Sequence, residues 1–393
     1  MLVLGCAPKP AQTPVAPDQH NPCRLVADSP TQLDTITVAL LEPVDWLSVE
    51  HALSPTNDSE RLLFRNLFHN VIQLDCQGTV RPGLADAWTA DPGGSWTFTL
   101  RDSAAFTPGE RRTADVVAAS LDSAIVLDAR HVRVPMRGPD SIPRFLADPA
   151  LAVVTGMASM GGEPDGIDLP ARNGAPAVSF KFDPNGDARD ALDREVDLVV
   201  TRDPALVDYV SNRVEFASFP LPWSRTYVLL EVGDRQGELA GGLHTPSVRS
   251  SLAKDAVRAS ARAAEPPYWW SDLGACPASS PQHAGNPSSR VVYRKGDEAA
   301  RGLAERIVAL ASTGLRAAGL DPAAFAAAVR GGSERAYVIG LPRQSLAPCR
   351  DASIWPAGAR LLPLIDTRAY AIVRKGAPPL SVEWDGTIRL VEP

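Results

Sequence analysis

The stretch SWTFTLRDSAAFTPGERRTADVVAASL, residues 95–121, determines how this part of the chain folds. Apolar and polar residues alternate over 95–101, which predicts a half-buried strand. Pro108 and Gly109 predict a turn, and Thr113 before an apolar run predicts a helix N-cap. We therefore expect strand, turn and helix here. The charged residues of this stretch serve folding, and we exclude them from the candidate site.

The flanking sequence continues the alternation of strand and helix patterns. Residues 35–41 are β-branched and apolar, which predicts a buried strand, and Ser59 precedes apolar residues at helical spacing. Residues 298–320 predict one long amphipathic helix, followed by a second helix and a strand. Asp385 and Gly386 predict a two-residue hairpin turn. The pattern predicts an α/β fold.

The composition excludes several functional classes. The chain has 393 residues, 45% of them hydrophobic, and a net charge of −7 without a basic stripe, which argues against nucleic-acid binding. No apolar window is long enough for a transmembrane helix. GxSxG, HExxH, GxGxxG and P-loop motifs are absent, the six histidines are isolated, and no CxxC pair occurs. We therefore predict no enzyme activity, no cofactor and no metal.

The five cysteines divide into one and four. Cys6 ends VLGC and precedes a Pro-rich stretch, so it resembles the lipidated cysteine of a bacterial lipoprotein signal. Only five residues precede it, so either the start is truncated or the resemblance is accidental. In an oxidising compartment the other four can pair in three ways. We predict nearest-neighbour pairing: Cys23–Cys76 and Cys276–Cys349.

Several signatures resemble one protein family in the order in which they occur. They are SERLLFRNLFHNVIQLDCQGTVRPGLADAW (59–88), the stretch at 95–121, REVDLVV (194–200) and HTPSVRSSLAKDAVRAS (244–260). Together they resemble the family 5 solute-binding proteins of ABC importers, which are receptors for peptides, nickel chelates and some sugars. The resemblance implies a two-lobed, periplasmic-binding-protein type II-like fold with mixed sheets, a hinge and an interlobe cleft.

The resemblance also implies a domain division and a function. Residues 1–30 are a tether, 31–240 and 360–393 form the first lobe with a subdomain at about 45–149, and 241–359 form a shortened second lobe. The implied protein is a monomeric receptor in the bacterial cell envelope, lipid-anchored and periplasmic or on the outer face. It captures a peptide or other small molecule and delivers it to an ABC permease.

Two departures from the family pattern leave alternatives open. The second lobe is short, and where the peptide binders carry an acidic residue this chain has GLPRQ (340–344), with Arg343. An arginine there favours an anionic ligand group over a free peptide. The alternative is a transport-defective relative that acts as a sensor or scaffold lipoprotein. A hydrolase would need a polar triad, of which the sequence gives no sign.

Candidate ligand contacts come from strand ends and loops that the resemblance places at the cleft. For each of them, core packing or a structural ion pair is the competing interpretation; for Arg202 the expected partner of such a pair is Asp203. The predicted ligand-binding residues are Trp46, Glu50, Thr201, Arg202, Trp223, Tyr227, Trp269 and Arg343.

Overall fold

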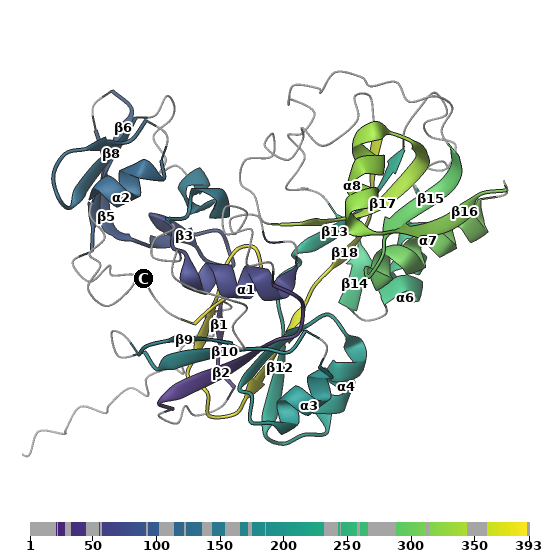
Figure 1. Cartoon of the computed structure of the whole chain (residues 1–393), viewed down its shortest axis with the longest axis horizontal. Coiled ribbons are helices and arrows are strands. Elements are labelled where there is room, and N and C mark those ends of the chain that lie inside the picture. Colours follow the sequence, from purple (N-terminus) through teal and green to yellow (C-terminus); the bar gives the residue numbers. More distant parts are fainter. Residues whose placement is uncertain are drawn as a thin grey trace, which may run out of the picture.

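The computed structural model has two lobes joined by crossing strands (Figure 1). The cysteine at 6, the helix cap predicted at Thr113 and the pair Cys276–Cys349 lie outside the residues that the structure describes. Those residues are 21, 23–27, 33–44, 55, 57–91, 93–101, 114–121, 123–135, 144–153, 166–171, 175–184, 186–231, 243, 245–257, 260–265, 288–311, 314–343 and 360–390.

The first lobe is built on a mixed six-stranded sheet. Its centre is parallel, with β2 between β11 and β10, and antiparallel strands complete both edges. The predicted buried strand at 35–41 is confirmed as β2. The sheet order is β12 (Phe216–Pro220), β19 (Tyr370–Arg374), β11 (Leu198–Thr201), β2 (Thr35–Leu40), β10 (Ala177–Phe182) and β9 (Gly166–Leu169).

Helices cover both faces of this sheet. On one face Val38 packs in a cluster with Leu62 and Leu63 of α1 (Asp58–Leu67). On the other face Ala39 packs with residues of α3 (Ala188–Asp193) and α4 (Pro204–Ser211). Because successive strand residues point to opposite faces, the continuous apolar run of β2 fills both cores.

A subdomain stands beside α1, at the upper left of Figure 1. Its apolar core is separate from those of the six-stranded sheet. The predicted strand at 95–101 is confirmed as β6. The elements are β5 (Ala85–Ala90), β6 (Ser95–Leu100), β7 (Ile125–Val126), β8 (His131–Pro135) and α2 (Ala114–Ala119), with β3 (Ile72–Leu74), β4 (Val80–Pro82) and the 3₁₀ turns Arg144–Ala147 and Pro149–Leu151 alongside.

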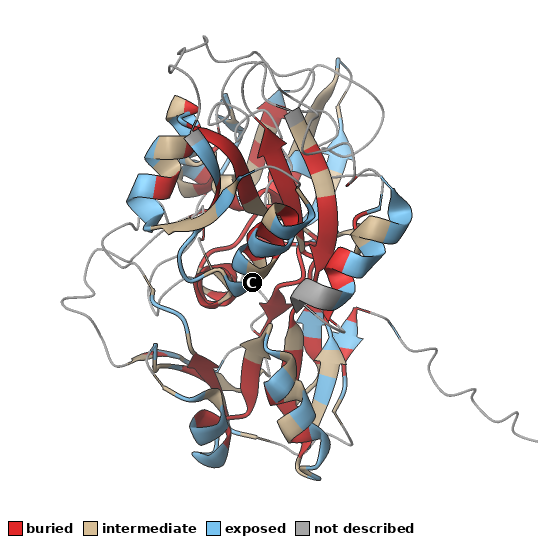
Figure 2. Ribbon diagram, turned by 90° about the vertical axis from the view of Figure 1, so that its right-hand side faces the viewer, coloured by how far each residue is buried: buried red, intermediate tan, exposed pale blue. Residues whose placement is uncertain are grey.

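The second lobe has its own mixed six-stranded sheet. Helices α6 (Pro246–Val257) and α7 (Glu298–Leu310) cover one face, and α8 (Pro322–Gly331) covers the other. In Figure 2 the buried residues follow the strands, and the helices turn exposed residues outward. The sheet order is β14 (Ala261–Ala263), β18 (Arg360–Thr367), β13 (Arg225–Glu231), β17 (Glu334–Pro342), β15 (Ser288–Arg294) and β16 (Arg316–Leu320).

Strand pairing draws the lobes differently from the predicted boundaries at 240 and 360. Both β13 and β18 hydrogen-bond within the second sheet, although the prediction gives their residues to the first lobe. These two strands enter the second lobe directly from the first, so the hinge lies near residues 221–225 and 367–370. Partner strands distant in sequence decide this boundary, and no local pattern shows them.

The long helix predicted over 298–320 is wrong. Helix α7 ends at Leu310, and residues 316–320 form β16, which pairs in parallel with β15. The sequence STG at 312–314 separates the two elements. Apolar alanines suit either state, and pairing with β15 selects the strand because it buries them at the sheet edge.

The C-terminal hairpin of β20 (Leu380–Val382) and β21 (Ile388–Arg389) lies under α1. Its turn has three residues rather than the predicted two, because Glu383 N donates to Thr387 O over 2.9 Å. Gly386 takes φ +82°, a conformation that suits glycine. A Cβ there would lie 3.1 Å from Ser224 Cβ, so the turn packs against the hinge.

The turn carries a buried network of charges, which we call the hairpin network: Arg65, Glu383, Asp385 and Arg389. Asp385 is fully buried and accepts hydrogen bonds from Arg65 Nε and Nη2 at 3.2 and 2.8 Å. Arg389 donates to Glu383 Oε1 at 2.9 and 2.6 Å. Burial acts to raise the pKa of Asp385, but the charges of Arg65 and Arg61 outweigh it and hold the pKa below its usual range.

A disulfide closes the structure near this hairpin. Cys23 Sγ and Cys76 Sγ are bonded at 2.02 Å, the pair that nearest-neighbour pairing predicts. Cys23 immediately precedes β1 (Arg24–Leu25), and β1 pairs with β20. The bond therefore ties the start of the first lobe to the turn between β3 and β4.

Candidate functional site

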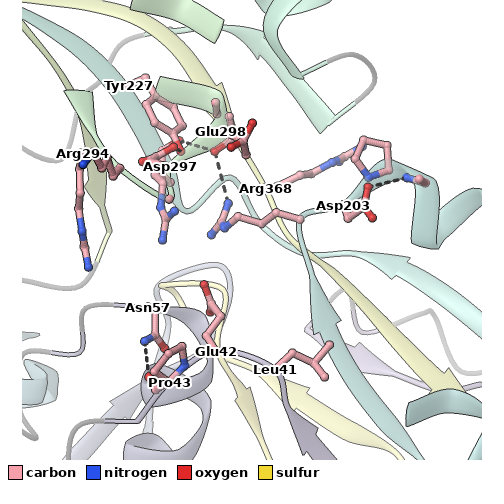
Figure 3. A pocket seen from close by; sticks show the side chains of 18 residues that line it. Leu41, Glu42, Pro43, Asn57, Asp203, Tyr227, Arg294, Asp297, Glu298 and Arg368 are labelled. Carbon is pink, nitrogen blue, oxygen red and sulfur yellow. Dashed lines mark hydrogen bonds between the residues drawn. The ribbon is translucent and has the colours of Figure 1, made fainter. Parts of the chain in front are cut away.

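A cavity of about 810 Å³ lies between the lobes at the hinge. Figure 3 shows Tyr227, Asp297 and Arg294 on one side of the open space, and Glu42 and Asn57 on the other. The first lobe contributes Leu41, Glu42, Pro43, Asn57, Arg202, Asp203, Pro204 and Ala205; the crossing strands and second lobe contribute Arg225, Tyr227, Arg294, Lys295, Gly296, Asp297, Glu298, Ala299, Thr367 and Arg368.

Two carboxylates of the wall are helix caps. Asp203 Oδ1 accepts from Ala205 N at 2.9 Å and caps α4, while Asp297 Oδ1 accepts from Ala300 N at 3.0 Å and caps α7. Asp297 also accepts from the Tyr227 hydroxyl at 2.9 Å. Burial, then the charge of Asp297, raises the pKa of Tyr227, so its phenol stays neutral and keeps donating. Both caps neutralise the positive end of their helix.

Glu42 likewise accepts hydrogen bonds from backbone N–H groups at the start of α1. Its Oε2 accepts from Asp58 N at 2.8 Å and from Ser59 N at 3.2 Å, and Asn57 Oδ1 accepts from Glu60 N at 2.8 Å. Asn57 is therefore the N-cap, and the predicted cap at Ser59 is wrong because that residue already lies inside the helix. Burial raises the pKa of Glu42, and the charge of Asp58 raises it further.

Arg202 closes the back of the cavity as a clamp between the lobes. Its Nε and Nη2 donate to Asp58 at 2.5 and 3.2 Å, and Nη2 and Nη1 also reach Ser224 Oγ at 3.2 Å and Thr367 Oγ1 at 3.3 Å. Ser224 and Thr367 belong to the two crossing segments. The guanidinium is thus engaged by protein groups on both sides of the hinge.

Asp58 is the anion around which this clamp is built. Burial acts to raise its pKa, but the charges of Arg202, Arg225 and Arg61 outweigh burial and hold the pKa well below its usual range. Arg225 Nη2 lies 3.8 Å from Asp58 Oδ1, too far for a hydrogen bond, and Arg225 Nε is buried with no hydrogen-bond partner. Arg225 is therefore held by charge but incompletely hydrogen-bonded.

Two further arginines face the cavity without a carboxylate partner among the described residues. The Arg368 guanidinium carbon lies 4.6 Å from the ring centre of Trp223 and 5.6 Å from that of Tyr370, and its Nε is buried without a partner. Arg294, at the end of β15, is exposed. Stacking on aromatic rings orients a guanidinium while leaving its edge free to donate.

The structure brings two of the predicted ligand residues, Arg202 and Tyr227, to the cavity wall. The others that it describes lie elsewhere. Thr201 Oγ1 accepts from Asp203 N, Trp223 stacks with arginines, and Arg343 lies over the Trp384 ring with its guanidinium carbon 5.6 Å from the ring centre.

Burial in this position lowers the pKa of Arg343. Trp46, Glu50 and Trp269 lie outside the described residues. Contact of any predicted residue with a ligand stays a prediction.

The sequence prediction does not include Arg225, Arg294, Asp297 and Arg368. Arg294 and Arg368 directly end or follow β15 and β18, the same position that suggests Thr201 and Arg202 after β11. Their position at strand ends could have suggested them, but nothing in the local sequence shows that those strand ends meet at the hinge.

Neither a metal cluster nor a membrane span emerges from the described part of the chain. No group of three or more His, Cys, Asp or Glu side chains there could hold a metal ion. No helix there has the length and apolarity to cross a membrane.

Similarity to known sequences is limited. No family model matches the chain. A putative binding protein of Haemophilus influenzae is 27% identical over 112 residues, a match that covers 28% of this chain and 21% of that protein. The match therefore spans about a fifth of the relative.

Similarity to solved structures is extensive. A dipeptide-binding protein from Pseudoalteromonas in complex with Met-Leu gives a TM-score of 0.63 at 14% identity, over 91% of this chain and 99% of that one. NikZ from Campylobacter jejuni in complex with Ni(L-His) gives 0.59 at 12%, over 90% and 97%. AgaA from A. tumefaciens in complex with agropinic acid gives 0.58 at 12%, over 87% and 94%. The chain has the two-lobed α/β fold of the family 5, peptide- and nickel-binding solute-binding proteins of ABC importers, in a divergent form.

Proposed function

We propose that this protein is a receptor that captures a small ligand between its lobes and presents it to an ABC importer. The observation that carries the proposal is the open cavity of about 810 Å³ at the hinge, walled by both lobes. This volume is in the range of small-molecule sites. Lobes joined by two strands can close over a ligand, and a transporter can read the closed form.

The structural relatives support this choice. The matched proteins hold a dipeptide, a nickel–histidine complex and agropinic acid, all of which are small solutes. The sensor alternative, which the shortened second lobe suggests, would be favoured by a cleft filled with side chains. The open cavity between the lobes favours capture (Figure 3).

Three finer elements belong to the same proposal. A lipid on Cys6 would hold the receptor at the cell envelope, and residues 7–30 would be the tether. A monomer with one cleft suffices for delivery to a permease. The cavity wall supplies binding and positioning groups, and we assign the protein no catalytic step.

The test is thermal unfolding of the full chain against peptides, nickel chelates, sugars and agropinic acid, with native mass spectrometry of freshly purified protein to find a co-purified ligand. We expect at least one class to raise Tm saturably, because a ligand that binds only the folded state stabilises it. Ala205→Trp, in the cavity wall, should abolish that shift. Ala324→Trp, at an exposed alanine of α8, should keep it.

A saturable shift that survives in Ala205→Trp would place binding outside the cavity. The absence of any shift and of any co-purified molecule would contradict the receptor function.

A further inference from the structure

We infer that the ligand carries an anionic group, a carboxylate or a phosphate, which Arg368, Arg225 and Arg294 hold in the cleft. This inference rests on the proposed function, since it names the ligand class of the same cavity. The described lining residues include five cationic and four anionic side chains. The inference rests on a difference between them: the anionic side chains all have protein partners, whereas several of the cationic ones are incompletely paired.

The anions of the wall are already engaged. Glu42, Asp203 and Asp297 each accept hydrogen bonds from the first backbone N–H groups of a helix. A ligand ammonium group at one of these carboxylates would have to share it with the helix N–H groups that the carboxylate already caps. The fourth, Glu298, pairs with Arg301 at 2.5 Å on the surface of α7. The described wall therefore offers a cationic ligand no free, buried carboxylate.

The cations divide differently. Arg202 is fully occupied by the hinge clamp, and Lys295 pairs with Asp321 at 3.1 Å. By contrast, the Nε atoms of Arg225 and Arg368 are buried without a partner, and Arg294 has no carboxylate partner among the described residues. The buried Nε atoms are out of reach of a ligand, but they show that neither guanidinium has a complete set of protein partners. A bound anion would add a counter-charge beside two such guanidiniums at once.

The arrangement also positions these groups. Trp223 and Tyr370 stack with Arg368, and Arg225 Nη2 lies 3.8 Å from Asp58 Oδ1, so both guanidiniums are oriented before a ligand arrives. Figure 3 shows Arg294 and Arg368 across the open space from Glu42 and Asn57 of the first lobe. Arg225, Arg294 and Arg368 come from crossing strands and the second lobe. An anion that they hold would face the first lobe and complete the cleft on closure.

One alternative uses the same geometry. Closure could bring Glu42 to the arginines of the opposite wall, so that an interlobe ion pair takes the place of a ligand anion. Glu42 already caps α1, which argues against it. The two cases differ in how loss of an arginine changes affinity. If the arginine pairs with Glu42 on closure, its loss should weaken the binding of every ligand; if it holds a ligand anion, its loss should weaken the binding of anionic ligands alone.

The experiment is calorimetric titration of the full chain with matched pairs that differ in one charge. The pairs are glutarate and glutaramide, Ala-Glu and Ala-Gln, and glucose 6-phosphate and glucose, so that carboxylate and phosphate are separated. We expect the anionic member of at least one pair to bind at least tenfold tighter. Arg368→Gln should weaken it at least tenfold and leave the neutral member unchanged.

Arg294→Gln is the second variant, since an exposed residue can be replaced without loss of folding; it should reduce the same preference. Arg330→Gln, an exposed arginine on α8, should not. Neutral members that bind as tightly as anionic ones would overturn the inference, and their binding would leave the receptor function standing. Equal weakening of both members by Arg368→Gln would also overturn it, in favour of the Glu42 ion pair. If no member of the three pairs binds, the anion inference fails, and the wider panel above decides the receptor function separately.

Discussion

The hairpin network and the cleft wall use the same side chains in opposite ways. In the hairpin network both guanidiniums have a carboxylate: Arg65 donates to Asp385 and Arg389 to Glu383, and all four side chains are nearly inaccessible. In the cleft, Arg225 and Arg368 keep a buried Nε without a partner, and Arg294 faces solvent. Paired arginines hold the hairpin against α1. Incompletely paired ones remain available to a molecule from outside.

The difference shows that complete charge pairing in this fold lies at the C-terminal hairpin rather than in the cleft. Buried pairs contribute little net stability relative to apolar packing, yet breaking one leaves a stranded charge and costs several kcal/mol. The hairpin network therefore fixes one position for the C-terminal turn. Incomplete pairing in the cleft costs stability and favours ligand binding. Substitutions in the two regions should separate these roles.

The largest effect is expected from Asp385→Ala. It removes both hydrogen bonds from Arg65 to Asp385 and leaves that buried guanidinium with Glu383 Oε2 at 3.6 Å, so the free energy of unfolding should fall by up to about 5 kcal/mol. Urea denaturation measures this. Asp190→Ala is the control: it removes an exposed pair with Arg194 at 3.9 Å and should cost less than about 1 kcal/mol. A loss for Asp385→Ala as small as that of the control would show that the network does not stabilise the fold.

Acidification should gradually weaken both the hairpin network, through Asp385, and the Arg202 clamp, through Asp58. The pKa values of Asp385 and Asp58 are lowered in the folded state, so the unfolded chain takes up protons first as pH falls. Their contribution is full above the unfolded value near 3.9 and is lost as pH falls below it toward the folded pKa. Urea midpoints at pH 7, 5, 4 and 3 measure it. Asp385→Ala should reduce the slope, and an unchanged slope would exclude Asp385 as a source.

Arg202 combines features of the two regions: it lines the cavity, as the cleft arginines do, and it is paired with protein groups, as the hairpin arginines are. Arg202→Ala should cost about 2 kcal/mol, the scale of charge-assisted hydrogen bonds. Arg202→Lys keeps the charge but loses the two-pronged contact with Asp58, so it should recover only part. Thermal unfolding with and without ligand separates stability from affinity. A variant that stays fully stable but loses ligand would assign Arg202 to the ligand instead.

The smallest change in stability is expected from Arg294→Gln. This exposed side chain has no carboxylate partner in the described part of the chain, so unfolding should change by less than about 0.5 kcal/mol. Urea denaturation at neutral pH is sufficient. A loss of 2 kcal/mol or more would mean that Arg294 has a structural role, and the contrast between the two regions would no longer hold there.

The sequence predicts what short-range physics controls. The strand at 35–41, the strand at 95–101 and the two-lobed α/β fold follow from periodicity and from the ordered family signatures. The error at 298–320 arises because alanine-rich segments fit both helix and strand, and the partner strand decides. The hairpin network joins Arg65 to Asp385 across 320 residues, which no local pattern reveals.

The candidate site is predicted only in part for the same reason. Arg202 and Tyr227 lie in the wall because strand ends and crossing segments meet at the hinge. Arg343 is also at a strand end, but it turns toward Trp384 rather than the cavity. Whether an arginine is paired depends on neighbours that come from distant parts of the chain, so the sequence could not separate Arg202 from Arg368.

Closure of the lobes on a bound ligand is the central claim, and a distance between lobes tests it most directly. Spin labels introduced through an unnatural amino acid at Val214, which is 82% exposed on the first lobe, and at Arg330 on the second would report that distance by electron–electron resonance. We expect a saturating ligand, with an anionic one as the expected case, to shift the distribution to shorter distances, and Arg368→Gln to prevent the shift at the same ligand concentration. An unchanged distribution with a ligand that calorimetry shows to be bound would contradict closure of the lobes on the ligand.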